Sequence, residues 1–319
     1  MNTDILRRFS ENTCVCEIIH SQWESMHAYG ILAHKNLGQL LRLVRTLDTG
    51  QASFFLHIDK RADTAPYEQE LGDLRRMPNV EFVKRYHSPW ASFGTVRAQR
   101  AAMEAALRAQ PRFTHVTLLT GQDYPIKPPD EIDLFFDVHL STSFIGYLPG
   151  DTKKQRKKQQ RARYRNWYLY FAGRHWRISS KLLKRVGIER RIPDGLRPVK
   201  GRAFFTLSRE CTEYALRFFK ANPRYVKFFQ HTKFPDEHFW HTILLNSPLR
   251  ETVENKTLRY EPFEDRKPFR ARGRVLHKED FAELKAESSK CFFAKKFDPT
   301  VDSDILDLID RHILRVPNP

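Results

Sequence analysis

The sequence predicts an α/β fold with a mixed, mostly parallel sheet flanked by helices. Short apolar segments with the composition of strands alternate with longer segments of helical periodicity. Hydrophobic residues make up 40% of the 319 residues and aromatic residues 13%, which allows a sizeable core and excludes a disordered chain. Polar residues follow several of the apolar segments, as expected where a parallel sheet binds a ligand.

The first regular elements form a βαβ unit. Residues 29–34, with the sequence YGILAH, are predicted as a strand, and residues 53–59, SFFLHID, as a second strand. Between them, leucines and a valine at helical spacing predict a helix over 37–48. His34 and Asp59 end the two strands, and ligands of open α/β sheets bind at such carboxyl ends. We therefore expect both side chains on the ligand side of the sheet.

Later segments continue this pattern. Strands are predicted at 79–83, 115–121, 143–148 and 201–208, and helices at 95–110, 209–222, 223–230 and 235–246. Asp123 follows the strand at 115–121, so we expect it to share a crevice with Asp59. No internal repeat or low-complexity linker divides the chain. Residues 27–319 are therefore expected to form one domain, with residues 1–26 as an N-terminal extension outside the core.

The composition indicates anionic partners. The formal net charge is +17, which favours phosphates, anionic glycans, nucleic acid or an acidic membrane surface. The spacing of the four cysteines is neither a disulfide framework nor a zinc motif, so a reducing compartment fits. No apolar run reaches the roughly 18 residues of a membrane span, and no signal peptide is evident. We expect a cytoplasmic protein with peripheral contact to the anionic inner face of the membrane.

A basic loop is predicted at about 151–177. Between Asp151 and Glu189 the sequence has no acidic residue, and cations crowd residues 153–165. Aromatic residues are interleaved with the end of this run, a pattern also found where proteins bind nucleic acid. No helix-turn-helix, zinc-finger or RNP-type motif accompanies it. We rank a solvated loop first, contact with an anionic acceptor or membrane second, and nucleic acid third.

The segment 231–246, HTKFPDEHFWHTILLN, allows three interpretations. Asp236 and Glu237 in the first turn of a helix stabilise it whatever the function. A metal site, as in a metal-dependent hydrolase, would take its ligands from His231, Asp236, His238 and His241. The spacing is not H-E-x-x-H, however, and no second cluster stands elsewhere. In the third interpretation, Glu237 is a general base presented to a cleft.

Six segments from Gly30 to the C-terminus carry a resemblance to a known family. They are GILAHKNLGQLLRLVRTLD, FFLHIDKRAD, LLTGQDYPIK, KGRAFFTLSRE, PDEHFWHTIL and FFAKKFDPTVD. In order and spacing they are similar to the core-2/I-branching glycosyltransferases, a family that also contains the peptide O-xylosyltransferases. The resemblance implies a GT-A-like fold and an inverting transfer from a UDP-sugar, UDP-N-acetylglucosamine or UDP-xylose, without a divalent cation. The implied acceptor is a hydroxyl of a glycan or glycoconjugate.

The resemblance also implies which residues bind the donor. Asp59 matches the aspartate that contacts uracil, and Asp123 matches a motif near the donor. Lys296 matches the basic residue that holds the diphosphate. A second cation lies in FRARGRV, where Arg272 is expected and Arg270 and Arg274 are the alternatives. His34, at the end of the first strand, is expected on the same side.

The implied catalytic base is Glu237. Contacts to the substrates are expected from Asp236, from Arg163 in the central Arg-Tyr pair, and from Tyr260, which aligns with an aromatic residue near the donor sugar. No metal site or cofactor is expected, because Lys and Arg can stabilise the departing diphosphate. The aspartates of 302–304 precede a segment of helical periodicity and are interpreted as a helix cap.

The function that the sequence favours is therefore metal-independent, inverting glycosyl transfer from a UDP-sugar to a glycan or glycoconjugate. The main alternative is a nucleic-acid or anionic-polymer binding protein that acts through residues 153–165, although no nucleic-acid partner is expected. A metal-dependent hydrolase is the third hypothesis.

Overall fold

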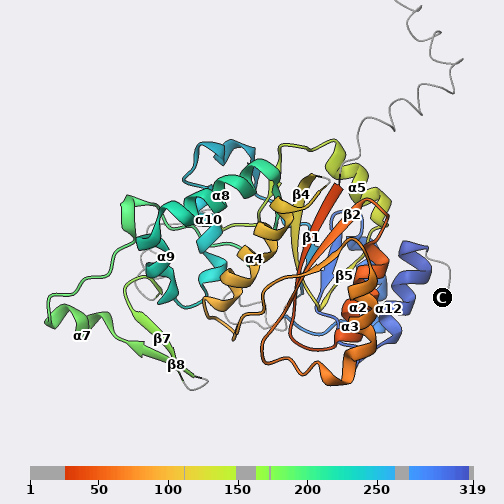
Figure 1. Cartoon of the computed structure of the whole chain (residues 1–319), viewed down its shortest axis with the longest axis horizontal. Helices are drawn as coiled ribbons and strands as arrows, with labels where there is room; N and C mark the ends of the chain where they lie inside the picture. The colour runs from red at the N-terminus through yellow and green to blue at the C-terminus, as the bar shows by residue number, and fades with distance from the viewer. Residues whose placement is uncertain (1–25, 111, 149–162, 172–173, 263–272, 316–319) are drawn as a thin grey trace, which may run out of the picture.

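The computed structural model describes residues 26–110, 112–148, 163–171, 174–262 and 273–315. A seven-stranded sheet runs through the centre of the molecule (Figure 1). Its order is β10 (Val253–Glu254), β6 (Ser143–Phe144), β9 (Thr206–Ser208), β4 (Phe113–Thr120), β1 (Met26–Ala33), β2 (Ala52–Ile58) and β3 (Val80–Phe82). Strands β4, β1, β2 and β3 are parallel, whereas β9 is antiparallel to both β4 and β6. The predicted fold class is confirmed.

Alternation along β1 divides its side chains between two helical layers. Tyr29 and Ile31 pack with α2 (Leu37–Leu47), while Ala28 faces the other core. Gly30 also faces that second layer, where a Cβ would lie 2.8 Å from Leu118 and 2.9 Å from Ala102 of α4. The absence of a side chain at Gly30 therefore lets α4 pack closely on the sheet.

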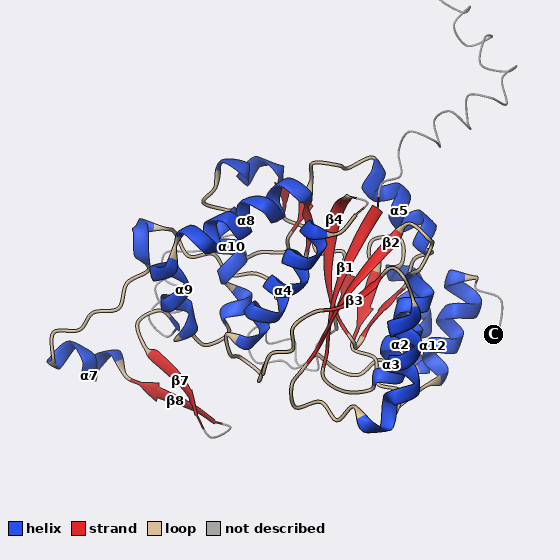
Figure 2. Cartoon of the chain, viewed as in Figure 1, coloured by secondary structure: helices blue, strands red, loops and turns tan. Residues whose placement is uncertain are grey.

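Helices cover both faces of the sheet (Figure 2). The face with Tyr29 carries α2, α3 (Glu68–Arg76), α5 (Pro129–Asp137), α11 (Phe281–Glu287) and α12 (Asp304–Ile309). The face with Ala28 carries α4 (Gly94–Arg108), α8 (Arg209–Ala221), α9 (Pro223–Gln230) and α10 (Phe239–Leu244). Within the described residues, no helix is both long and apolar enough to span a bilayer.

A second sheet was not predicted and joins the C-terminal segment to the main sheet. It consists of β11 (Arg259–Tyr260), β12 (Phe293–Lys295) and β5 (Asp123–Pro125). In the antiparallel pair of β12 with β5, Lys295 lies opposite Asp123. The backbone of Phe297 continues this connection by donating to the carbonyl of Gln122, 2.9 Å away. The AKKFD segment is thereby held at the carboxyl end of β4.

Three sequence predictions about elements need correction. Met26, placed in the N-terminal extension, begins β1. The strands predicted at 143–148 and 201–208 are shorter, Ser143–Phe144 and Thr206–Ser208. The predicted basic loop holds a hairpin, β7 (Trp167–Phe171) and β8 (Arg174–Ile178), followed by α7 (Ser180–Arg185). Of the basic run 153–165, only 163–165 are among the described residues.

The helix predicted over 235–246 is interrupted at its start. Residues Pro235–Glu237 form a 3₁₀ turn, and α10 begins only at Phe239, after His238 with φ −137°. The carbonyl of Glu237 accepts from the backbone of Gly201 at 2.8 Å and is thereby removed from the helical ladder. Glu237 therefore lies in a turn tied to a neighbouring segment, and not in the first turn of an α-helix.

Candidate active site

Glu237 lies in the turn before α10, where two cations bind its carboxylate. Its Oε2 is 2.6 Å from a terminal nitrogen of Arg163 and 3.3 Å from Nζ of Lys200. The Glu237 side chain is 26% exposed, so a substrate hydroxyl can approach it. A fixed and accessible carboxylate is what a general base requires. The structure thus places two of the predicted residues, Glu237 and Arg163, in direct contact.

A buried histidine positions Arg163. Nε2 of His238 lies 2.9 Å from a terminal nitrogen of Arg163, and Nδ1 of His238 lies against the hydroxyl of Tyr164. Because arginine only donates, Nε2 accepts and the proton of a neutral ring is assigned to Nδ1. Burial, followed by the charges of Arg163 and Lys200, holds the pKa of His238 well below its usual value. His238 therefore lies just before α10 and contacts both Arg163 and Tyr164.

Gly201 fixes the position of the Glu237 backbone. A Cβ at Gly201 would collide with the ring of His241 and with the carbonyl oxygen of Gly146. Only glycine therefore allows the segment to come close enough for its N–H to reach the carbonyl of Glu237. The neighbouring Lys200 then reaches the Glu237 carboxylate. Sequence reasoning quoted this segment as a motif without giving Lys200 or Gly201 a role, although a glycine next to a cation was a usable signal.

Asp236 differs from its neighbour Glu237 in its electrostatic environment. Its Oδ1 is buried and has no hydrogen-bond partner among the described residues. Burial, followed by the charge of Glu237, raises the pKa of Asp236 to about 7, while Arg163 and Lys295 act in the opposite direction. A large fraction of Asp236 is therefore protonated at neutral pH, so Asp236 can donate a hydrogen bond where Glu237 accepts one.

A network of charges leads from Glu237 towards the C-terminal lysines. Arg202 lies 3.7 Å from one carboxylate oxygen of Glu261, and Nζ of Lys295 lies 3.8 Å from the other. Lys296 is the next residue after Lys295. Burial lowers the pKa of His34, and the charges of nearby lysines, including Lys296, lower it further. Glu261 therefore lies between Arg202, which closely follows the Lys200 that binds Glu237, and Lys295 of the basic C-terminal segment.

Asp59 ties the end of β2 to the neighbouring loop. Its two oxygens accept from the backbone N–H groups of Arg61 and Ser88, both at 2.8 Å. Burial raises its pKa, but these hydrogen bonds outweigh burial and the pKa of Asp59 lies below its usual value. The charge of Asp59 also raises the pKa of His34, against the effect of the lysines. The charges of Asp59 and Lys296 thus both act on the pKa of His34, Asp59 raising it and Lys296 lowering it.

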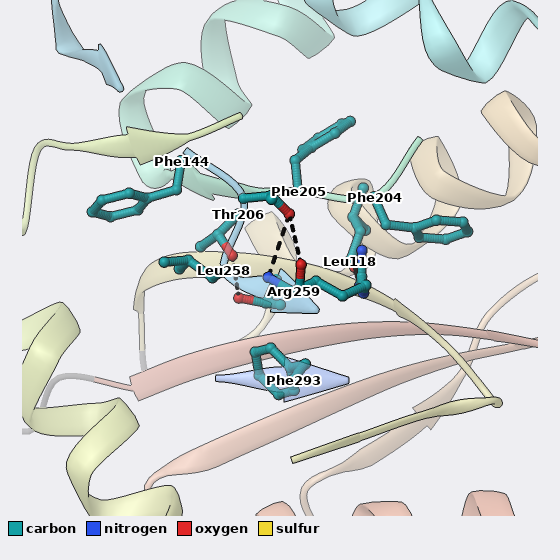
Figure 3. A pocket seen from close by; sticks show the side chains of 10 residues that line it. Leu118, Phe144, Phe204, Phe205, Thr206, Leu258, Arg259 and Phe293 are labelled. Atoms are coloured by element: carbon teal, nitrogen blue, oxygen red, sulfur yellow. Dashed lines mark hydrogen bonds between the residues drawn. The ribbon is translucent and has the colours of Figure 1, made fainter. Parts of the chain in front are cut away.

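Asp123 is held by interactions within the protein. The backbone N–H and the hydroxyl of Thr120 donate to its Oδ2 at 2.6 and 2.7 Å, and the guanidinium of Arg259 binds Oδ1. Arg259 also donates to the carbonyl of Leu118 at 3.0 Å, beside Phe204 (Figure 3). Neither carboxylate nor guanidinium is appreciably exposed, at 0% and 8%. Asp123 is thus bound within the protein, and its ion-pair partner Arg259 was not singled out in the sequence.

Two hollows in the described part of the chain are lined by none of the predicted site residues. The one around Arg259 and Phe204 has a volume of about 10 Å³, room for about one water molecule (Figure 3). A larger hollow of about 450 Å³ lies between α4, α8 and α9 and is lined by none of the predicted site residues.

The remaining predicted residues lie apart from Glu237 or outside the described part of the chain. Arg272 and its alternative Arg270 belong to the segment 263–272, which is not described. Arg274 binds both oxygens of Asp280, each at 2.6 Å. Burial, followed by a hydrogen bond to Glu283, raises the pKa of Tyr260 above its usual value. Tyr260 and Arg274 thus lie on the α11 side of β11, whereas Arg259 points to Asp123.

The metal ligands considered in the sequence do not gather around one point. In the described part of the chain, the group with suitably close ligand atoms is His277, Glu279 and Asp302. It includes neither His231, Asp236, His238 nor His241. Asp302 accepts from the backbone of Ile305 at 3.2 Å and lies one residue before Ser303, the N-cap of α12, which makes no side-chain capping bond itself.

Comparison with known proteins gives the family. Xylosyltransferase 2 of Canis lupus familiaris is 26% identical over 305 residues, covering 90% of this chain and 33% of that protein. Xylosyltransferase oxt of Drosophila pseudoobscura pseudoobscura is 24% identical over 286 residues, covering 85% of this chain and 31% of that protein. The chain thus spans about one third of the length of the curated relatives it matches.

Solved structures resemble the chain more distantly. The 4-diphosphocytidyl-2C-methyl-D-erythritol synthase of Anaerococcus prevotii superposes with a TM-score of 0.30 at 11% identity, over 71% of this chain and 97% of that one. The family model described as Core-2/I-Branching enzyme matches residues 27–285, which is most of the chain. This chain belongs to the Core-2/I-Branching enzyme family.

Proposed function

We propose that this chain is an inverting, metal-independent glycosyltransferase. It moves N-acetylglucosamine or xylose from the UDP-sugar to a hydroxyl of a glycan or glycoconjugate. The observation that carries the proposal is the placement of Glu237, accessible and fixed by Arg163 and Lys200, in a chain whose family consists of glycosyl-transferring enzymes. The relatives named xylosyltransferase support the donor class.

Glu237 serves as the base in a single displacement. The acceptor hydroxyl gives its proton to the Glu237 carboxylate while its oxygen forms a bond to C1 of the sugar. The bond from C1 to the diphosphate breaks at the same time, and UDP leaves with the electron pair. The transition state is oxocarbenium-like, as in glycoside hydrolysis. Asp236, whose pKa is raised to about 7 beside Glu237, donates a hydrogen bond to a substrate oxygen in its protonated form in this proposal.

The other side of the site binds UDP. The resemblance to the family implies that Asp59 accepts from the uracil, and its position at the carboxyl end of β2, on the ligand side of an α/β sheet, supports this role. Lys296 and Arg272 neutralise the diphosphate as it gains charge, which is the role a metal ion takes in other transferases. Lys295 lies between the two sides. Its Nζ is 3.8 Å from a carboxylate oxygen of Glu261, and its charge lowers the pKa of Asp236.

A donor screen tests this function. Release of UDP is measured for a panel of UDP-sugars, with and without EDTA, and the proposal expects turnover with at least one of them that EDTA leaves unchanged. Glu237→Gln should retain UDP binding and lower kcat by at least about 10²-fold, the contribution of a general base. Glu251→Gln is the matched control, because Glu251 is 93% exposed and contacts only its neighbour Arg250 in the described chain. Full turnover by Glu237→Gln would remove Glu237 as the base.

A further inference from the structure

The hairpin β7–β8 and α7 project from the body as an arm, defined here as residues 167–171 and 174–188 (Figures 1 and 2). One face of the hairpin is attached. The ring of His175 bonds to the carbonyl of Trp90 at 2.7 Å, and the ring of Tyr170 contacts His87. At the base, Arg190 is buried and donates to the carbonyl of Asn166 at 2.7 Å and the hydroxyl of Thr232 at 2.8 Å. The arm is therefore fixed at one end and along one face.

The other face of the arm exposes large apolar side chains. Leu169 and Trp176 are direct cross-strand partners, so they share the face opposite His175, and they are 39% and 59% exposed. After the hairpin, Leu182, Val186 and Ile188 are 57%, 68% and 48% exposed. Isolated apolar side chains on a surface are ordinary, but a group of five within a protruding segment indicates a binding surface.

The charged side chains within the arm are cations, and an acid, Glu189, directly follows the arm and lies 4.0 Å from Nζ of Lys184. From Arg165 to Ile188 the sequence contains no acidic residue. The exposed cations of the arm are Arg174, Arg177, Lys181, Lys184 and Arg185. Aliphatic and tryptophan side chains flanked by lysine and arginine are characteristic of protein segments that lie in the interface of an anionic membrane.

We propose that the arm docks the protein on an anionic lipid membrane. Leu169, Trp176 and the apolar side chains of α7 enter the headgroup region while the cations contact lipid phosphates. A second copy of this chain is a poorer occupant, because it would set cation against cation. A nucleic acid is also poorer, because Leu182, Val186 and Ile188 cannot stack on bases as aromatic side chains do. The proposal does not depend on the glycosyltransferase activity.

Co-sedimentation of the full chain with vesicles tests the docking. Vesicles of phosphatidylcholine alone are compared with vesicles that contain about 30% phosphatidylglycerol. Binding is expected only to the anionic vesicles and should weaken with added salt. Replacing Lys181, Lys184 and Arg185 by Gln should weaken it about 100-fold, since each cation near such a surface contributes about fivefold. Leu169→Ser with Trp176→Ser should weaken it at least tenfold.

Two control variants make the same kinds of substitution outside the arm. Leu134→Ser with Val138→Ser changes side chains that are 65% and 71% exposed on the α5 side of the body. Arg45→Gln, Arg76→Gln and Arg108→Gln remove three exposed cations outside the arm. Both controls should bind within about twofold of the parent. An equal loss of vesicle binding in the arm and control variants would show a general charge effect and overturn the proposal. Absence of binding to anionic vesicles would also overturn it, and so would salt-resistant dimerisation through the arm.

Discussion

The two sides of the candidate active site are held in different ways. On the side proposed to bind the donor, hereafter the donor side, Asp59 and Asp123 are 4% and 0% exposed, and both accept from backbone N–H groups, of Arg61 and Ser88 and of Thr120 respectively. On the base side, Glu237 is partly exposed and is bound by the side chains of Arg163 and Lys200. Changes on the donor side should therefore lower stability first, whereas changes on the base side should alter activity and its pH dependence.

The largest expected effect on stability is at Asp123. Asp123→Asn leaves the guanidinium of Arg259 buried without a counter-charge, because both side chains are inaccessible to water. Breaking such a pair from one side costs about 3–5 kcal/mol. The double variant Asp123→Asn, Arg259→Met should recover part of the loss, since it removes the uncompensated charge. Equilibrium unfolding in urea measures both.

A matched control separates the loss of the Asp123–Arg259 pair from the effect of removing any carboxylate. Asp304→Asn changes an aspartate that is 69% exposed and should stay within about 0.5 kcal/mol of the parent. If Asp123→Asn costs less than about 1 kcal/mol, the donor side is not held by the Asp123–Arg259 pair, and the contrast between the two sides fails.

The base side should show a pH dependence that comes from Asp236. Its pKa of about 7 in the folded protein lies above the usual value of 3.8. Between these values the folded protein binds a proton that the unfolded chain has released, so this group's contribution to stability is complete below about pH 4 and is lost as the pH rises to about 7. Because Asp236 is partly exposed, we discount the full shift and expect about 2 kcal/mol.

Asp236→Asn should remove this slope. The measurement is the urea midpoint of the parent and the variant at several values between pH 4 and pH 8. The buried histidines His57 and His115 have lowered pKa values and make stability rise with pH over part of this range. Their contribution is the same in parent and variant, so it cancels in the difference between the two curves. Parallel curves would show that Asp236 titrates normally and would contradict the assignment of a protonated donor beside Glu237.

The sequence predicted the donor side better than the base side. Periodic apolar segments located β1, α2 and β2 to within a few residues, and the carboxyl ends of parallel strands necessarily meet at one edge. His34 and Asp59 could therefore be placed together without coordinates. Lys296 required the resemblance to a family, because the short strand β12 gives little signal of its own.

The base side could not be predicted in detail because its contacts are non-local. The pairing of Glu237 with Lys200 depends on a backbone hydrogen bond from Gly201 that also interrupts the predicted helix. Periodicity favoured a continuous helix, and the tertiary contact overrode it. The contacts of His238 could not be predicted for the same reason, since Arg163 and Tyr164 are brought to it from another segment.

The smallest expected effect distinguishes the candidate arginines for the diphosphate. Arg274 is 31% exposed and already binds both oxygens of Asp280, so Arg274→Gln should cost about 1 kcal/mol of stability or less and change the Kd for UDP by less than twofold. Arg272→Gln should leave stability unchanged and raise the Kd for UDP at least tenfold, because it removes a charge that the proposal places at the diphosphate. Isothermal titration calorimetry with UDP measures both. The reverse result would assign the diphosphate to Arg274. The Arg274–Asp280 pair would then have to open when UDP binds, and this part of the donor side would be no more rigid than the base side.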